Sequence, residues 1–121
     1  MAAALIQDTE VYKMAEKLSD LIWRAFDRWD YKAQHTIGLQ VIRSADSIAA
    51  NLAEGFGRFS PGDRKRYYHI ARGSFEETKC WMRKAIRRGI LSNEDRGQIS
   101  EVIHSLGPGL NRFIKNQNIT K

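Results

Sequence analysis

Basic side chains concentrate in one stretch of the sequence, residues 58–88, and could bind the phosphates of a nucleic acid. The stretch holds ten basic and three acidic residues, whereas the rest of the chain holds ten basic and eleven acidic ones. At about 100° per residue of helix, five of these cations share an arc of about 80°. We call this set the basic edge: Lys65, Arg72, Lys79, Arg83 and Arg87.

The basic edge would extend ~33 Å along a helix, which is long enough to follow several phosphates. We therefore expect contact with RNA or DNA at low sequence specificity, with further cations at its flanks: Arg58, Arg66, Lys84 and Arg88. A plainer interpretation stays open. Glu76 can pair with Arg72 and Lys79 at helical spacing, so the cations could instead form a solvated face.

Motifs for catalysis or metal binding are incomplete. Gly55-x-Gly57 lacks the third glycine and the Gly-Lys-Ser/Thr of phosphate loops, so we interpret it as a helix end, with either glycine able to take left-handed geometry. Glu101-x-x-His104 is half of a di-metal site whose second half is missing. Cys80, the one cysteine, can supply neither a disulfide nor a zinc set. We expect no enzyme activity, metal or cofactor.

One catalytic alternative remains. Arg64 and His69 have the Arg-x(4–6)-His spacing of small all-α HEPN-type ribonucleases, in which dimerisation assembles the site. The match is short in a chain rich in arginine. In that fold the motif normally lies late in the chain, whereas here it falls at the start of the third predicted helix. A HEPN-like ribonuclease is therefore kept only as an alternative to a binding protein.

A set of polar residues is expected where the second and third helices meet. The structural interpretation is a buried, hydrogen-bonded cluster that fixes the register of the two helices, since buried polar groups need partners. The functional interpretation is a ligand pocket. The residues concerned, beside Arg72, are Asn51, Glu54, Ser74 and Glu77.

Apolar residues recur at three- and four-residue spacing and predict helices over 9–29, 36–54, 61–88 and 92–116. Asp8 or Thr9 is expected to cap the first helix, Ser60 the third, and the segment from Ser92 the fourth, while Gly89 ends the third. Ala45, Ala49 and Ala53 predict a close helix contact. Gly107-Pro108-Gly109 predicts a kink or break in the last helix.

The chain of 121 residues is the size of one domain, which we place at 1–121. Four amphipathic helices joined by short loops predict an all-α, up-down antiparallel four-helix bundle. Nothing in the sequence predicts a secretion signal or a membrane span, so a cytoplasmic location is expected. The net charge of +6 favours an acidic partner.

Three runs of sequence resemble a known family: the segments 43–58 (RSADSIAANLAEGFGR), 67–77 (YYHIARGSFEE) and 88–91 (RGIL). The chain is similar to the bacterial "four helix bundle protein" family encoded in intervening sequences of large-subunit ribosomal RNA genes. That family is in turn similar to the accessory variability protein of diversity-generating retroelements. The resemblance implies a barrel-like homopentamer with a basic surface for nucleic acid and, in the retroelement setting, a reverse transcriptase as partner.

Together these observations predict a non-enzymatic, oligomeric nucleic-acid-binding adaptor. Basic edges repeated around a ring would combine weak contacts into one avid surface. The main alternative is a protein-interaction scaffold whose basic surface meets an acidic protein.

Overall fold

The chain is built from long helices. The computed structural model describes residues 5–119, and no strand occurs among them. A 3-10 turn, Ile6–Asp8, precedes α1 (Glu10–Phe26); α2 (Tyr31–Ala33) leads through a π-helical turn, Gln34–Gly38, into α3 (Leu39–Phe56); α4 (Pro61–Arg87) and α5 (Asn93–Ile119) follow. Counting 31–56 as one helical segment gives four long helices, which confirms the all-α fold class.

Local capping residues set most of the helix ends as predicted. The Thr9 and Ser60 hydroxyls accept hydrogen bonds from the backbone N–H groups of Tyr12 and Asp63, at 3.3 and 3.1 Å. Ser92 does the same for Asp95 at 3.1 Å. Gly89, directly after the C-cap of α4, has a φ of +69°, which favours glycine.

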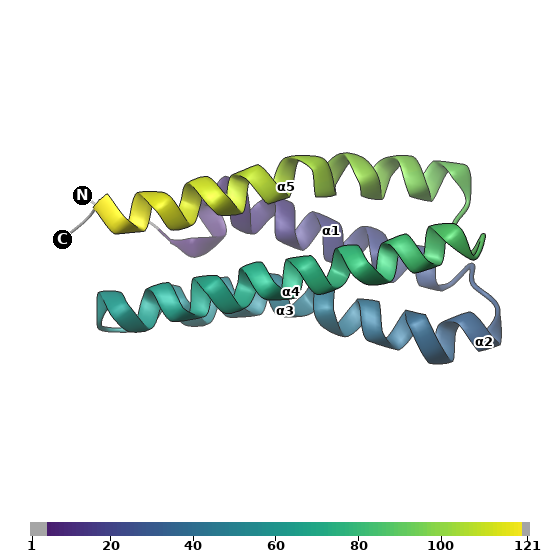
Figure 1. Ribbon diagram of the computed structural model, residues 1–121, viewed down its shortest axis with the longest axis horizontal. Helices are drawn as coiled ribbons and strands as arrows, with labels where there is room; N and C mark the ends of the chain where they lie inside the picture. Colours follow the sequence, from purple (N-terminus) through teal and green to yellow (C-terminus); the bar gives the residue numbers. More distant parts are fainter. Residues whose placement is uncertain (1–4, 120–121) are drawn as a thin grey trace.

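The four long helices lie side by side, with both ends of the chain at one end of the molecule (Figure 1). α3 packs against α1 and α4, and α5 packs against the same two helices, so one apolar core runs through the molecule. Small residues line the contact of α1 and α3. The Ser19 hydroxyl of α1 donates to the Ala45 carbonyl of α3 at 3.2 Å, in agreement with the contact predicted for the alanine face.

The first connection differs from the prediction. α1 ends at Phe26 rather than residue 29, and the next helical segment begins at Tyr31 rather than residue 36. Asp30 explains the early start, because its carboxylate accepts from the Ala33 N–H at 2.8 Å as an N-cap. The π-helical turn then brings Gly38 against the Phe26 ring, so closely that a Cβ on Gly38 would lie 2.6 Å from a ring carbon.

Pro108 does not break the last helix, so of the predicted kink or break the break is wrong. α5 is continuous from Asn93 to Ile119. The neighbouring Leu106 and Leu110 are fully buried, and Pro108 itself is exposed. Gly107 and Gly109 let Phe75 of α4 and Met14 of α1 pack against the helix backbone, since a Cβ at either position would lie 3.0–3.2 Å from those side chains. Packing on both sides outweighs the one backbone hydrogen bond that proline removes.

The interpretation of the Gly55 and Gly57 pair also needs correction. α3 does end at Phe56, with Gly57 as its C-cap, but Gly57 has an ordinary φ of −83°. Gly89 is the glycine with positive φ among residues 5–119. Gly55 lies inside α3 and is buried, and a Cβ there would lie 2.8 Å from the Tyr68 ring. Gly55 therefore serves the close approach of α3 and α4.

Candidate nucleic-acid interface

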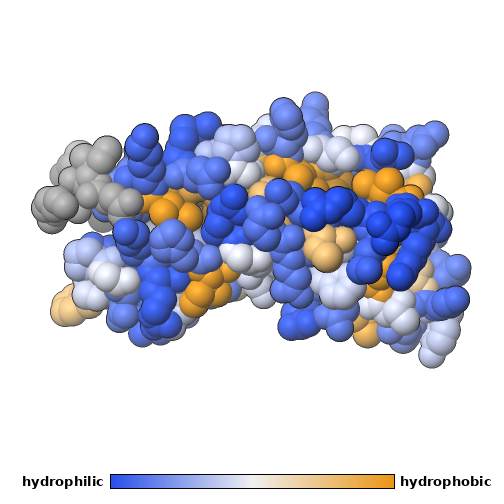
Figure 2. Space-filling model, in the orientation of Figure 1, coloured by the Kyte–Doolittle hydropathy of each residue, from blue (hydrophilic) through white to orange (hydrophobic). Residues whose placement is uncertain are grey.

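The structure places the basic edge along the side of α4 that borders α5. The Arg72 Nε donates to the Asn111 Oδ1 of α5 at 2.8 Å, and Lys79 and Arg83 line a groove shared with α5. Lys65, Arg83 and Arg87 are exposed to solvent, whereas Arg72 and Lys79 are half-buried. Figure 2 shows this face, with strongly hydrophilic surface over α4 beside apolar surface between α4 and α5.

Glu76 neutralises the middle of the basic edge. Its Oε2 accepts from the Arg72 guanidinium and lies 3.3 Å from the Lys79 Nζ. The hydrogen bond from Arg72 is the main cause that holds the pKa of the Glu76 carboxyl below its ordinary value, and Lys79 adds to it. Two of the five cations are thus already paired with an acid of their own helix, as the solvated-face interpretation anticipated.

Five of the other predicted cations have no acidic partner within 4 Å among residues 5–119: Lys65, Arg83, Lys84, Arg87 and Arg88. Four of them lie in the last turns of α4 and at its C-cap. Cations there also complement the negative end of the helix dipole. This end of α4 consequently carries the largest free positive charge of the predicted site.

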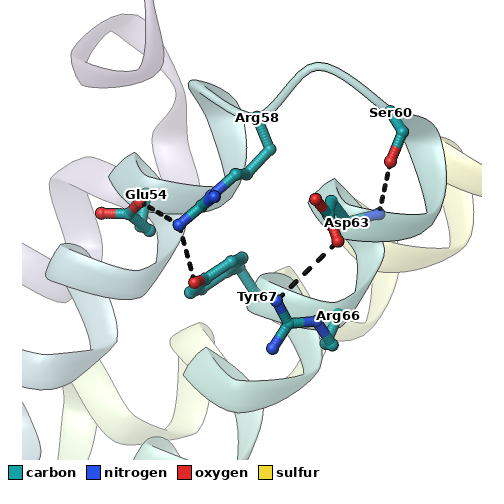
Figure 3. Close-up of polar contacts among 6 residues, drawn as sticks. All are labelled: Glu54, Arg58, Ser60, Asp63, Arg66 and Tyr67. Carbon is teal, nitrogen blue, oxygen red and sulfur yellow. Dashed lines mark hydrogen bonds and ion pairs between the residues drawn. The ribbon is translucent and has the colours of Figure 1, made fainter.

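The half-buried side chain of Arg58 contacts residues of α3 and α4 (Figure 3). Its guanidinium pairs with Glu54 at 2.7 Å and donates to the Tyr67 hydroxyl at 2.8 Å. Arg66 pairs with Asp63 at 3.8 Å, and the guanidinium carbons of Arg58 and Arg66 each lie 4.7 Å from the centre of the Tyr67 ring. These stacked groups connect α3 to the start of α4, so Arg58 has an architectural role that its charge alone did not reveal.

Arg64 holds the loop between α3 and α4. Its Nη1 donates to the carbonyls of Arg58 and Phe59, at 3.1 and 2.8 Å. At about 100° per residue, Arg64 and His69 point about 140° apart around α4. His69 lies instead beside Arg72, near Asn111 and Lys115 of α5. The structure thus gives the Arg64 and His69 pair no shared site within one subunit.

The predicted polar cluster does not form. Asn51 donates to the Ser47 carbonyl of its own helix at 2.8 Å, and Glu54 pairs with Arg58. Glu77 is exposed and accepts from the Trp81 Nε1 at 3.2 Å. Ser74 contributes its backbone carbonyl, which accepts from the Thr78 hydroxyl at 2.8 Å. Each bond is local to one helix or to the loop that follows it, because these side chains lie outside the buried seam.

A different pair forms the buried polar contact between α3 and α4. The Thr78 hydroxyl lies 2.9 Å from the Ser44 Oγ, and both side chains are buried. Small hydroxyl residues within apolar stripes gave no sequence signal that distinguished them from core positions. The register contact expected between these helices therefore exists, made by residues other than those predicted.

Sequence reasoning also missed the groove between α4 and α5. It holds about 210 Å³ and is lined by Lys79, Met82, Arg83, Ile86, Ser100, Ile103 and His104. The groove can be predicted only when the face of α5 that meets α4 is known, and the sequence of either helix alone does not determine that face.

Two general properties of the described residues bear on function. Within residues 5–119, no three His, Cys, Asp or Glu side chains lie close enough together to hold a metal ion. In the same range, every helix is too short or too polar to span a lipid bilayer.

Comparison with known proteins identifies a family. A search of curated proteins found no match to the chain. A solved structure of a protein of unknown function from the S23 ribosomal protein family of Bacteroides thetaiotaomicron VPI-5482 has the same fold, with a TM-score of 0.76. The two are 22% identical over 87% of this chain and 98% of the other. Residues 7–112 match the family described as 23S rRNA-intervening sequence protein, and the chain belongs to that family.

Proposed function

We propose that this chain is a non-enzymatic protein that binds nucleic acid at low sequence specificity through the basic edge of α4. The observation that carries the proposal is the row of exposed, unpaired cations formed by Lys65, Arg83 and Arg87. Lys84 and Arg88 flank the C-terminal end of this row, with Arg88 turned toward α2. These residues neutralise phosphates and release counterions, which supplies affinity without reading base sequence.

The spacing of the cations suits a phosphate backbone. Lys65 and Arg87 are ~33 Å apart along α4, a length that covers about ten phosphates of one strand at ~3.4 Å each. Arg83 and Arg87 are four residues apart and lie on neighbouring turns, so both can reach the same strand. Arg72 and Lys79 contribute less while Glu76 holds them.

A charge-reversed variant tests the proposal. Arg83→Glu together with Arg87→Glu is expected to abolish the retention of RNA and DNA in a gel shift at low salt. The matched control is Lys17→Glu with Arg24→Glu, which reverses two exposed cations of α1 that have no acidic partner within 4 Å among residues 5–119. The control should retain binding because α1 does not border the basic edge. Equal retention of RNA and DNA by the charge-reversed variant and the control variant would refute the proposal.

The proposal includes an assembly in which up-down antiparallel subunits form a barrel-like homopentamer, as the family resemblance implies. Support for the antiparallel order comes from the common end of the two termini in Figure 1 and from Arg28 beyond α1, which pairs with Asp95 at the start of α5 at 2.7 Å. Exposed apolar side chains of α1 and α3, Trp23 and Leu39, suit a subunit contact. Light scattering after size exclusion measures the subunit number, and a monomer at micromolar concentration contradicts the assembly.

A protein-interaction scaffold is the second candidate, and Phe59 favours it. This ring is fully exposed in the loop between α3 and α4. A polymerase, such as the reverse transcriptase that the retroelement resemblance implies, is the narrower form of this candidate. Pull-down with and without nuclease separates the two functions: a partner retained after nuclease treatment supports the scaffold. Cleavage of RNA that His69→Ala abolishes would instead establish a ribonuclease.

A further inference from the structure

An apolar groove opens within the basic edge, between the C-terminal third of α4 and the first half of α5. Its floor is formed by Met82 and Ile86 of α4 and Ile103 of α5. Met82 is buried, and both isoleucines are half-buried, so apolar side chains reach the surface there. The volume of about 210 Å³ is roughly seven times the ~30 Å³ that one water occupies in the liquid.

The rim of the groove is cationic and carries two flat groups. Lys79 and Arg83 lie on the α4 side, and His104 lies on the α5 side. Arg83 and His104 are exposed, and neither has an ion-pair or hydrogen-bond partner among residues 5–119. Guanidinium and imidazole planes are surfaces on which unstacked bases pack in protein complexes with single strands. An apolar floor, a cationic rim and stacking planes together fit a ligand that is flat, apolar on its faces and attached to phosphate.

We propose that this groove holds a nucleobase of a single-stranded nucleic acid, whose flanking phosphates lie on Arg83 and Lys79. The inference rests on the proposed nucleic-acid binding and narrows its ligand. Duplex bases are stacked on one another and paired, so they cannot enter a groove in the side of a helix pair without being unstacked, which costs a few kcal/mol per base. A single strand can present a base freely. The protein consequently prefers single strands, whereas the phosphate contacts alone would favour the higher charge density of the duplex.

The test fills the groove without changing its charge. Ser100 is an exposed residue of α5 that lines the groove, and Ser100→Phe places a ring over the isoleucines. The matched control is Ser105→Phe, the same substitution at an exposed position of α5 outside the groove. Fluorescence anisotropy measures the affinity of each variant for labelled single-stranded and duplex oligonucleotides of equal length at one salt concentration. Circular dichroism verifies that both variants retain their helix content.

The unmodified protein is expected to bind the single strand more tightly than the duplex. Ser100→Phe should reduce this affinity ratio about fivefold or more, which is the effect of losing one base stack. Duplex affinity and the Ser105→Phe control stay unchanged. Equal affinity for single strand and duplex, or a preference that Ser100→Phe leaves intact, overturns the groove proposal while the basic edge stands. A protein that binds neither oligonucleotide overturns the proposed function itself. Equal losses on both oligonucleotides in Ser100→Phe would make the groove a general packing element and also refute the proposal.

Discussion

Replacing each of two helical glycines by alanine tests the close contact of α3 and α4. Alanine is better than glycine in a helix interior by about 0.5–1 kcal/mol. At Gly73, on the exposed side of α4, an added Cβ meets no atom within 4 Å, so Gly73→Ala should raise the free energy of unfolding by about that amount. At Gly55 the same atom would lie 2.8 Å from the Tyr68 ring, 2.9 Å from the Tyr67 Cβ and 3.0 Å from the Arg64 carbonyl.

Those neighbours of Gly55 cannot move independently, because one is backbone and another is the first side-chain atom of a helical residue. Overpacking of this kind costs about 1–3 kcal/mol, so Gly55→Ala should have a net loss of about 1 kcal/mol after the propensity gain. Urea unfolding at fixed protein concentration measures both variants, and their difference should be about 1–3 kcal/mol. A Gly55→Ala variant as stable as Gly73→Ala would show that the helices are not packed as described.

Three further predictions concern single contacts. Glu76→Gln should strengthen nucleic-acid binding, because it frees Arg72 and Lys79. Since the pKa of Glu76 is lowered, its ion pairs stabilise the fold fully above the ordinary carboxyl pKa and are lost as the pH falls below it. Glu76 therefore stays ionised between pH 7 and pH 5, and its protonation should not strengthen binding by the unmodified protein in that range. Ser44→Ala with Thr78→Val should cost less in urea unfolding than the two single variants summed, by about 1 kcal/mol, since each single change leaves a buried hydroxyl with fewer partners; strict additivity would contradict this. Arg28→Ala should lower stability more than Arg24→Ala, because the Asp95 carboxylate that it leaves is 7% exposed; equal thermal midpoints would refute it.

Short-range signals in the sequence predicted most of the fold. Thr9, Ser60, Gly89 and the segment from Ser92 determine helix ends through contacts within a few residues. Asp30 acts in the same way but lies in a polar stretch whose helical continuation has few apolar residues, so the periodicity missed it. At Pro108 the local signal was misleading. Proline inside a helix predicts a kink or a break, but packing from α1 and α4 keeps the helix continuous.

The candidate site could be predicted only as a pattern on one helix. The residue spacing placed the basic edge on one side of α4, and the pairing of Glu76 with Arg72 and Lys79 follows from the same spacing. Contacts between helices could not be predicted from the sequence. The stacking of Arg58 on Tyr67, the bond from Arg64 to the loop and the groove against α5 all depend on how the helices are placed together.

The salt dependence of nucleic-acid binding tests the central claim most directly. The predicted site has five unpaired cations, which are the three unpaired residues of the basic edge together with Lys84 and Arg88. Neutralisation of one phosphate by each predicts a slope of log K against log salt of about −3.5 per subunit on a single strand. The variant Arg83→Gln with Arg87→Gln should reduce the magnitude of that slope by about 1.4, whereas Lys17→Gln with Arg24→Gln should leave it unchanged. An affinity that does not vary with salt, or a slope that both pairs of substitutions alter equally, would contradict phosphate binding by the basic edge.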